Sequence, residues 1–301
     1  MSGLLASEPE QVAFHTPDGF WVHADYYGPT TKYVSGPIVI LLHAEGADRE
    51  VWKPLIDPLQ EAGFVVLALD MRGHGASSTS ETRTQLANRD PRLFQDVQHD
   101  LHGAYDWLAK QEYVDRARFA LVGAGAGAGS ALQYAAKDRS VDTVVCLSPE
   151  QQAPGLDPAG DLGQIHGRQI LLIASEDEQE ACKLLTKRSQ DTQTYFYEGA
   201  EGQRGGTDIL GKLPGIEKRI VSFLSRSVGQ PSRSVVYGSI NSNIYHTAGS
   251  RWIDEISRGN LRHYSSAREA EQRGLRASRS KGPRGKKIQE KTERRQPPAN
   301  P

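Results

Sequence analysis

A glycine-rich turn, LVGAGAGAGSAL from Leu121 to Leu132, is the stretch of this chain most suggestive of chemistry. It follows a run typical of a strand and leads into a run typical of a helix. Such a turn can present bare backbone amides to a phosphate, or it can lift a catalytic side chain above the edge of a sheet. Its function therefore depends on whether a nucleophile is present.

The phosphate interpretation rests on a literal match to the dinucleotide fingerprint. Gly123, Gly125 and Ala128 satisfy G-x-G-x-x-G/A, and Glu150 follows roughly 20 residues later. However, the turn follows the third strand of the main alternation and not the first βα unit. Glu150 also comes after a serine and a proline, outside any strand. A phosphate cradle therefore stays an alternative.

The composition favours a soluble, cytoplasmic protein. Two cysteines, Cys146 and Cys182, are too few for a disulfide framework or a thiolate metal cage. The opening MSGLLASEPEQ lacks the basic and apolar regions of a signal peptide. No apolar run approaches the roughly 18 residues that a membrane span needs. We expect no membrane association and no cofactor.

Charge is distributed unevenly and suggests three regions. From Val228 onward, 15 Lys and Arg oppose 6 Asp and Glu, whereas 21 oppose 31 before it. We predict a main domain over residues 1–227, a small module over 228–280 and a disordered basic tail over 281–301. The tail either solubilises the protein or binds RNA, DNA or an acidic partner weakly.

The first 227 residues alternate between strand-like and helix-like runs. GPIVILL, FVVLALD, ARFALVG, VDTVVCL, RQILLIA and TQTYFY are short and apolar or β-branched, as strands of a covered parallel sheet are. Helical patterns separate them, and we expect the last two helices over Glu178–Arg188 and Ile209–Leu224. Two antiparallel edge strands are expected around Asp18-Gly19. The fold class is therefore α/β, with a mainly parallel sheet covered on both faces.

Four loops at the carboxyl ends of these strands resemble those of α/β-hydrolases, near the dienelactone-hydrolase and serine-peptidase-like branches. They are HAEG after the first central strand, DMRGHGAS after the next, the glycine-rich turn, and SEDE. The resemblance covers roughly Val12 to Leu224. It implies an α/β-hydrolase fold and, if the protein is active, hydrolysis of a carboxylic ester or a peptide.

The resemblance also implies positions for a catalytic triad, and this chain departs from them. Gly125 stands where the G-x-S-x-G turn places serine, so no side chain is available for attack. Asp177 matches the acid. The base position in GAEGQRGGTD is Gly205, and no histidine occurs between His166 and His246. Two losses at matched positions predict a site without triad chemistry.

Other polar residues near these loops have plainer expected roles. The resemblance places oxyanion-hole amides near Ala44 and Ala126, and Glu45 either repels a developing oxyanion or points to solvent. His43 and His74 are expected to close their loops. We expect Cys146 in the core. Ser130 and Ser148 are the hydroxyls left open as unconventional nucleophiles.

The segment from Ser234 to Ser280 resembles the small metal-binding module of the Ada DNA-repair protein, through Tyr245-His246, Trp252, Asn260 and Gly274-Leu275-Arg276. The positions that hold zinc in that family correspond here to His246, Ser250, Ser278 and Lys281. One imidazole does not make a tetrahedral site, so we expect no metal. A module of this size then needs a neighbour to lean on, or is loose.

These expectations lead to a non-catalytic hydrolase-fold protein that binds a small apolar ligand or a protein partner. One alternative is an active serine hydrolase with a non-standard nucleophile. Another is a nucleic-acid-associated protein acting through its basic C-terminus. Labelling with serine-directed probes and salt-dependent nucleic-acid binding distinguish the three.

Overall fold

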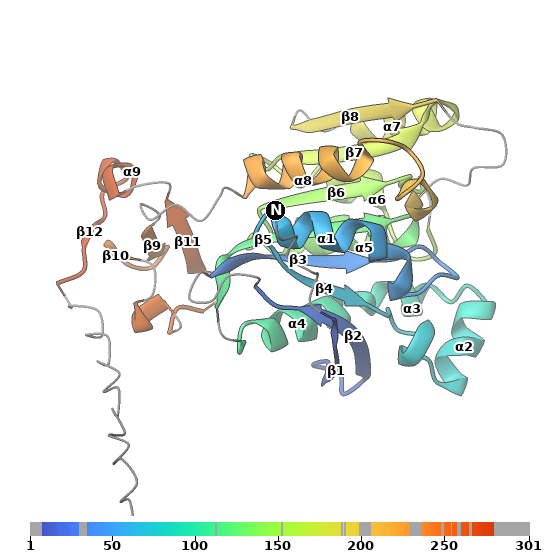
Figure 1. The fold of residues 1–301 in the computed structure, drawn as a ribbon, viewed down its shortest axis with the longest axis horizontal. Helices are drawn as coiled ribbons and strands as arrows, with labels where there is room; N and C mark the ends of the chain where they lie inside the picture. The colour runs from blue at the N-terminus through green and yellow to red at the C-terminus, as the bar shows by residue number, and fades with distance from the viewer. Residues whose placement is uncertain are drawn as a thin grey trace, which may run out of the picture.

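A computed structural model describes residues 8–29, 35–111, 113–151, 153–187, 189, 191–198, 206–228, 236–247, 250–253, 255–257, 260–264 and 267–279. Its largest element is an eight-stranded sheet in the order β1-β2-β4-β3-β5-β6-β7-β8 (Figure 1). The strands are β1 Glu10–His15, β2 Trp21–Tyr27, β3 Gly36–Leu42, β4 Val65–Leu69, β5 Val114–Ala124, β6 Thr143–Leu147, β7 Ile170–Ser175 and β8 Thr192–Tyr197. Strands β3 to β8 are parallel to one another, whereas β1 and β2 form an antiparallel hairpin in which β2 pairs antiparallel with β4.

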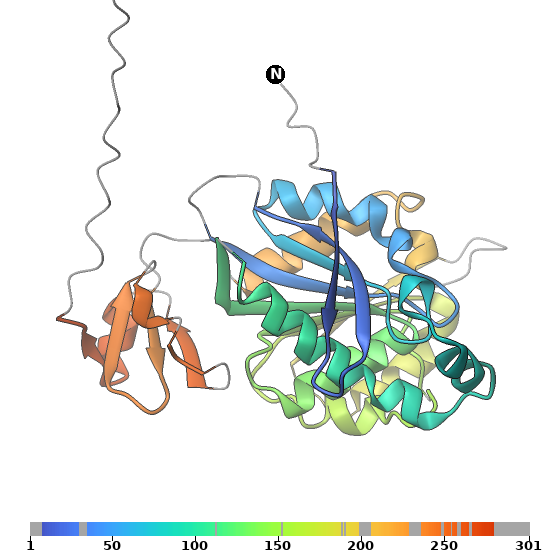
Figure 2. The ribbon, with the colours of Figure 1, turned by 90° about the horizontal axis from the view of Figure 1, so that it is seen from below.

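Helices cover both faces of this sheet and create two hydrophobic cores (Figure 2). Ile38, Ile40 and Leu42 of β3 pack with α4, α5, α6 and α7, while Val39 and Leu41 pack with α1 and α8. This alternation follows from the two-residue period of a strand. The helices and 3-10 turns of this region are η1 Arg49–Trp52, α1 Lys53–Glu61, η2 Gly75–Ser77, α2 Ser80–Ala87, α3 Pro91–Gln95, α4 Val97–Leu108, α5 Ala126–Lys137, α6 Pro158–Leu162, η3 Glu176–Glu178, α7 Gln179–Thr186, η4 Gly206–Ile209 and α8 Ile216–Ser227.

The predicted fold class is confirmed, with corrections to single helices. The helix expected over Ile209–Leu224 begins only at Ile216, because Pro214 and the left-handed Gly215 (φ 87°) interrupt it. The helix expected over Glu178–Arg188 runs from Gln179 to Thr186. Three helices, α2, α3 and α6, were not expected at all.

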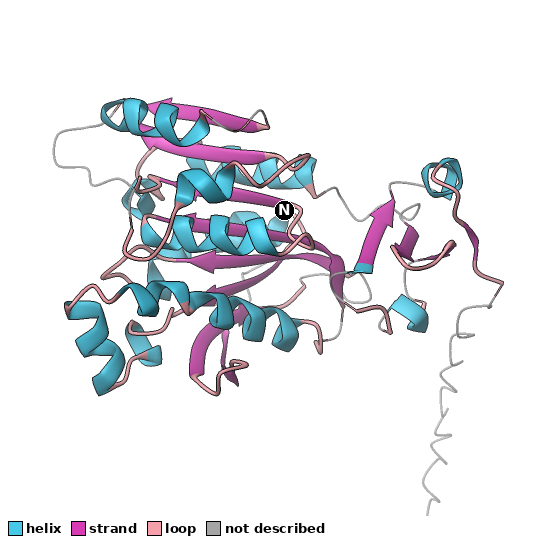
Figure 3. Ribbon diagram, turned by 180° about the vertical axis from the view of Figure 1, so that it is seen from behind, coloured by secondary structure: helices cyan, strands magenta, loops and turns pink. Residues whose placement is uncertain are grey.

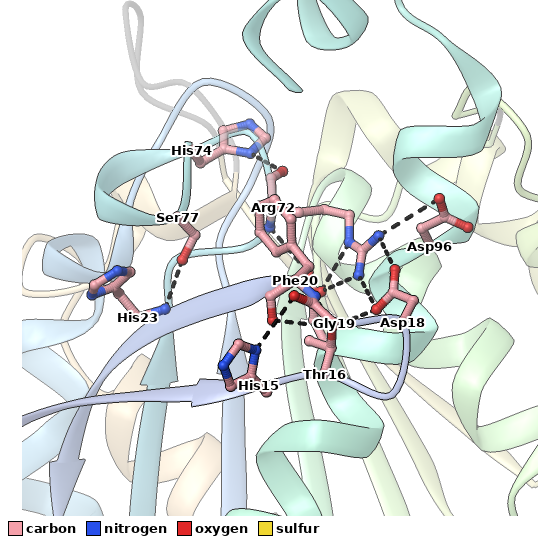
Figure 4. Close-up of polar contacts among 11 residues, drawn as sticks. His15, Thr16, Asp18, Gly19, Phe20, His23, Arg72, His74, Ser77 and Asp96 are labelled. Carbon is pink, nitrogen blue, oxygen red and sulfur yellow. Dashed lines mark hydrogen bonds and ion pairs between the residues drawn. The ribbon is translucent and has the colours of Figure 1, made fainter. Parts of the chain in front are cut away.

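A salt-bridge network fixes the edge hairpin to the loop after β4 (Figure 4). Arg72 is 5% exposed; its guanidinium pairs with Asp18 of the hairpin turn at 2.9 Å and with the fully buried Asp100 of α4 at 2.8 Å. Burial alone would raise the pKa of Asp18, but the hydrogen bond and charge of Arg72 lower it to about 2. The RGHG loop is therefore held rigidly against the hairpin.

Residues 236–277 contain a second, four-stranded sheet in the order β11-β9-β10-β12 (Figure 3). Its elements are β9 Val236–Ser239, β10 Ile244–Thr247, η5 Arg251–Ile253, β11 Leu261–Tyr264, α9 Ala267–Gln272 and β12 Arg276–Ala277. Tyr237 donates a 2.5 Å hydrogen bond to Asp115 of β5, which also pairs with Arg118 at 2.7 Å. Ala117 and Leu261 pack beside Tyr237 in a small apolar cluster. The small sheet therefore contacts the large one through Tyr237 and this cluster.

Two further predictions concern the basic tail and membrane-spanning helices. The basic tail, 281–301, lies outside the described residues. Within the described part of the chain, no helix is both long and apolar enough to cross a membrane.

Candidate functional site

The glycine turn joins β5 to α5 with the backbone geometry that the hydrolase resemblance implies. Gly125 has φ 51° and ψ −120°, a conformation that L side chains rarely adopt. Its N–H donates to the Leu147 carbonyl at 3.0 Å. A methyl group on Gly123 would lie 2.4 Å from the Gly127 carbonyl oxygen, and one on Gly127 would lie 2.4 Å from the His43 carbonyl oxygen. Glycine at these positions therefore serves close packing, whether or not a ligand binds.

The position of a side chain on Gly125 is crowded by two neighbours. A Cβ atom there would lie 3.2 Å from the Ala44 Cβ and 3.3 Å from Oε1 of Glu150. Burial raises the pKa of the Glu150 carboxyl, and the nearby Glu45 raises it further. We call the surroundings of the turn, formed by Ala44, Gly125, Ala126 and Glu150, the elbow site.

A carboxyl group beside the turn also bears on the phosphate interpretation. Pyrophosphate is attracted by bare amides at a helix N-terminus, but a neighbouring carboxylate repels it. Glu150 follows β6 and reaches over the turn, whereas the dinucleotide fingerprint requires its acidic residue on the ribose. The geometry therefore gives the phosphate interpretation no support.

Glu45 makes an ion pair rather than pointing freely into solvent. Its carboxylate accepts two hydrogen bonds from the Arg89 guanidinium, at 2.9 and 3.1 Å, and its side chain is 24% exposed. Arg89 approaches from the end of α2 with φ 48°. Because Arg89 neutralises Glu45, the repulsion expected at the oxyanion position is reduced.

On the acid side of the expected triad, the partly buried contacts involve Glu178 and not Asp177. Asp177 is exposed. The Glu178 carboxylate accepts hydrogen bonds from the Ser148 hydroxyl at 2.9 Å, the Ser175 N–H at 2.9 Å and the Ser175 hydroxyl at 3.0 Å. The Ser148 hydroxyl accepts the N–H of Gly206 at 2.7 Å. One polar network thus joins the ends of β6 and β7 to η4.

The base position, Gly205, lies outside the described residues, and Gly206 is the first residue described after it. A glycine at position 205 supplies no general base, and the sequence has no histidine between His166 and His246. The Gly206 N–H donates a hydrogen bond to the Ser148 hydroxyl. A backbone N–H cannot remove a proton from serine.

The two histidines near the elbow are tied into loops, as expected. His43 is fully buried; its Nδ1 donates to the Ala44 carbonyl at 2.8 Å and its Nε2 accepts the Met71 N–H at 3.1 Å. Burial, with a smaller contribution from His74, lowers the pKa of His43 to about 4. His74 contacts the Arg72 carbonyl at 3.2 Å, and burial lowers its pKa also. His43 is therefore neutral at pH 7 and has both nitrogens occupied.

The remaining candidate nucleophiles are buried. Ser130 is 1% exposed within α5, and Ser148 is 8% exposed with φ 43°. Cys146 is fully buried in the core, as predicted, and burial raises the pKa of its thiol. A thiol held protonated in an apolar core is a poor nucleophile.

The small sheet brings together some of the residues whose positions resemble those of a metal site. The Ser250 hydroxyl and Nδ1 of His246 lie 3.5 Å apart, and the Ser278 N–H donates to the Tyr245 carbonyl at 2.8 Å. Lys281 lies outside the described residues. Among the described residues, no group of three His, Cys, Asp or Glu side chains could hold a metal ion.

Sequence reasoning did not identify the roles of Glu150 and Glu178. Glu178 carries a signal that could have been used, because Ser175-x-x-Glu178 is a capping box, and the structure shows both of its hydrogen bonds. Glu150 carries none, since its position over Gly125 depends on how the loop after β6 folds back.

The sheet is mainly parallel, a glycine elbow joins β5 to α5, and polar loops follow β6 and β7 at their carboxyl ends. Together these features define the architecture of an α/β-hydrolase fold. A family model for the alpha/beta hydrolase fold matches residues 37–188, about half of the chain. The chain therefore belongs to the α/β-hydrolase fold family.

Individual relatives match over shorter stretches. An uncharacterized protein of Mycobacterium tuberculosis is 31% identical over 138 residues, which cover 46% of this chain and 44% of that protein. Epoxide hydrolase B of the same organism is 38% identical over 79 residues, 26% of this chain and 21% of that protein. The chain thus spans less than half the length of the curated relatives it matches.

Solved structures confirm the fold over the large domain. An esterase of Pyrococcus furiosus superposes with a TM-score of 0.58 at 19% identity, covering 74% of this chain and 94% of the esterase. A dienelactone hydrolase of Anabaena variabilis gives a TM-score of 0.54 at 20% identity, covering 73% and 97%. At these identities the likeness concerns the fold alone.

Proposed function

We propose that this chain is a non-catalytic member of its family that binds a small ligand or a protein partner at the elbow site. The observation that carries the proposal is Gly125. Its backbone has the strained conformation that raises a nucleophile above the sheet, yet it has no side chain to present. The sequence also has no histidine near the base position.

The elbow site retains features suited to binding. Ala44 is partly exposed and Glu150 half-buried beside the bare turn. Because burial and Glu45 raise the pKa of Glu150, this carboxyl is protonated more readily than a surface glutamate and can then donate a hydrogen bond. A small, largely apolar molecule with one acceptor oxygen matches this chemistry.

Binding can be tested with short aliphatic ketones, which resemble ester substrates but cannot be hydrolysed. We expect the backbone amide resonances of Gly125 and Ala126 to shift on titration. In Ala44→Leu the larger side chain occupies the space beside Gly125, so binding should weaken at least tenfold. The matched control is Ala47→Leu, in the same loop, which should bind normally. Ketones that leave the Gly125 and Ala126 signals unchanged would remove the small-ligand form of the proposal.

One contact favours the alternative of an active hydrolase. The Ser148 hydroxyl is hydrogen-bonded to the Glu178 carboxylate, an arrangement that could remove its proton. Against this, Ser148 is buried and its oxygen already accepts the Gly206 N–H. Ester turnover that disappears in Ser148→Ala but persists in Ser130→Ala would establish this alternative.

A further inference from the structure

The small C-terminal sheet carries a hollow of about 420 Å³ beside the positions that resemble a metal site. Residues from β9, β10 and η5 line it, together with Ser278 near the end of the described chain. Its lining residues are Ser239, Ser242, Ile244, His246, Trp252, Glu255, Ile256 and Ser278. The elbow site plays no part in it.

The lining combines an aromatic ring, a carboxylate and hydroxyl groups. Among the described residues that line the hollow, Glu255 is the one carboxylate and none is Lys or Arg. The hollow is far larger than a bare metal ion, and a single imidazole does not fix one.

We propose that this hollow binds the guanidinium or ammonium group of an organic cation. An indole attracts a cation through its ring quadrupole, and the attraction is strongest for Trp among the aromatic residues. A guanidinium group is planar and presents a fork of donors that matches a carboxylate such as Glu255. The Ser239 and Ser242 hydroxyls each accept one backbone N–H, and a hydroxyl oxygen has a second lone pair that can accept an N–H of the cation.

Either the chain itself or a separate molecule could supply such a cationic group. Residues 281–301 contain seven Lys and Arg against two Glu, and they begin three residues after Ser278. A tether this short raises the effective concentration of the chain's own side chains. The other source is a separate amine or a basic peptide.

The experiment uses the full-length protein at pH 8.5 and follows the Trp252 indole N–H resonance by NMR, assigned from Trp252→Phe. Agmatine is the cationic probe, and N-butylurea is a neutral molecule of similar shape and size. We expect agmatine to shift the Trp252 signal with saturation, and N-butylurea to shift it at least fivefold more weakly. Glu255→Gln should weaken agmatine binding about five- to tenfold, whereas Glu61→Gln, at an exposed position of α1, should leave it unaltered.

A variant in which the seven basic residues of 281–301 are replaced by serine distinguishes the two sources. If the chain's own side chains occupy the hollow, this variant moves the Trp252 signal before any probe is added and binds agmatine more tightly. If they do not, the variant behaves as the parent protein and still binds agmatine. Equal responses to agmatine and N-butylurea, unchanged binding in Glu255→Gln, or no response of Trp252 in both parent and variant would each overturn the proposal.

Discussion

The Ser148 hydroxyl donates a hydrogen bond to the Glu178 carboxylate across 2.9 Å, and the same oxygen accepts the N–H of Gly206 at 2.7 Å. In a hydrolase of this family the resemblance would place the acid and the base in this region. Here the polar groups of the region satisfy one another. The contact therefore acts as a structural link between the ends of β6, β7 and η4.

Removal of the Ser148 hydroxyl should reduce stability. In Ser148→Ala the Gly206 N–H loses its acceptor and Glu178 loses a donor, and unsatisfied buried groups cost about 1–3 kcal/mol. Denaturant unfolding measures the loss. Ser80→Ala, at an exposed position of α2, is the matched control and should change stability by less than about 0.5 kcal/mol. Equal effects of the two substitutions would contradict the structural role of Ser148.

Gly127 packs closely against the loop after β3, so its replacement by alanine should cost much more stability than the replacement of Gly129, which also lies in α5. In Gly127→Ala the new methyl group would meet the His43 carbonyl oxygen at 2.4 Å and the Leu42 carbonyl oxygen at 2.5 Å. Both oxygens belong to the backbone, which cannot easily move away. We expect a loss of about 3 kcal/mol or more. In Gly129→Ala the nearest atom is a Leu156 methyl at 3.0 Å. This substitution should stay within about 1 kcal/mol because alanine also favours the helix.

Acid should destabilise the protein through His43. Its pKa is lowered to about 4 in the folded state from 6.5, so the folded protein binds fewer protons than the unfolded chain between these values. The resulting stability is complete above pH 6.5 and is lost as the pH falls through 4, by about 3 kcal/mol. His74, whose pKa is lowered too, acts in the same direction. NMR titration should show a neutral His43 ring at pH 5.5; a protonated ring at that pH would contradict its buried hydrogen bonds.

Docking of the small sheet should depend on Tyr237. Tyr237→Phe removes the hydrogen bond to Asp115 within a buried contact, at a cost of about 1–3 kcal/mol. Hydrogen exchange in β9 and β11 should accelerate while β3 and β4 keep their protection. Tyr245→Phe loses a hydrogen bond to Glu271 inside the small sheet and is the control. Unchanged exchange in Tyr237→Phe, or the same pattern in both variants, would show that the contact does not hold the sheets together.

Much of the large domain could be predicted because its strands are apolar and its turns contain glycine. Alternate residues of β3 pack into the two cores, so the sequence pattern could not show which residues face which core. The length of the run and its flanking glycines still indicated a strand. The helices α2 and α3 lack a strong apolar stripe, but Thr79 and the Asp90-Pro91 pair are N-terminal signals that the sequence does contain.

Only those parts of the site that depend on the local sequence could be predicted. Gly125 could be placed from the sequence because the turn is local. Glu150 could not, since it reaches the turn through the loop after β6. Asp177 and Glu178 are neighbours in sequence, and only the three-dimensional course of η3 shows which of them faces Ser148.

The central claim, that this chain lacks the chemistry of a serine hydrolase, is tested most directly by intact-protein mass spectrometry after incubation with a fluorophosphonate probe. The account predicts no covalent adduct, and no p-nitrophenyl ester turnover above that of Ser148→Ala purified in parallel. A single stoichiometric adduct on one serine, abolished together with ester turnover by Ser148→Ala or Ser130→Ala, would contradict it.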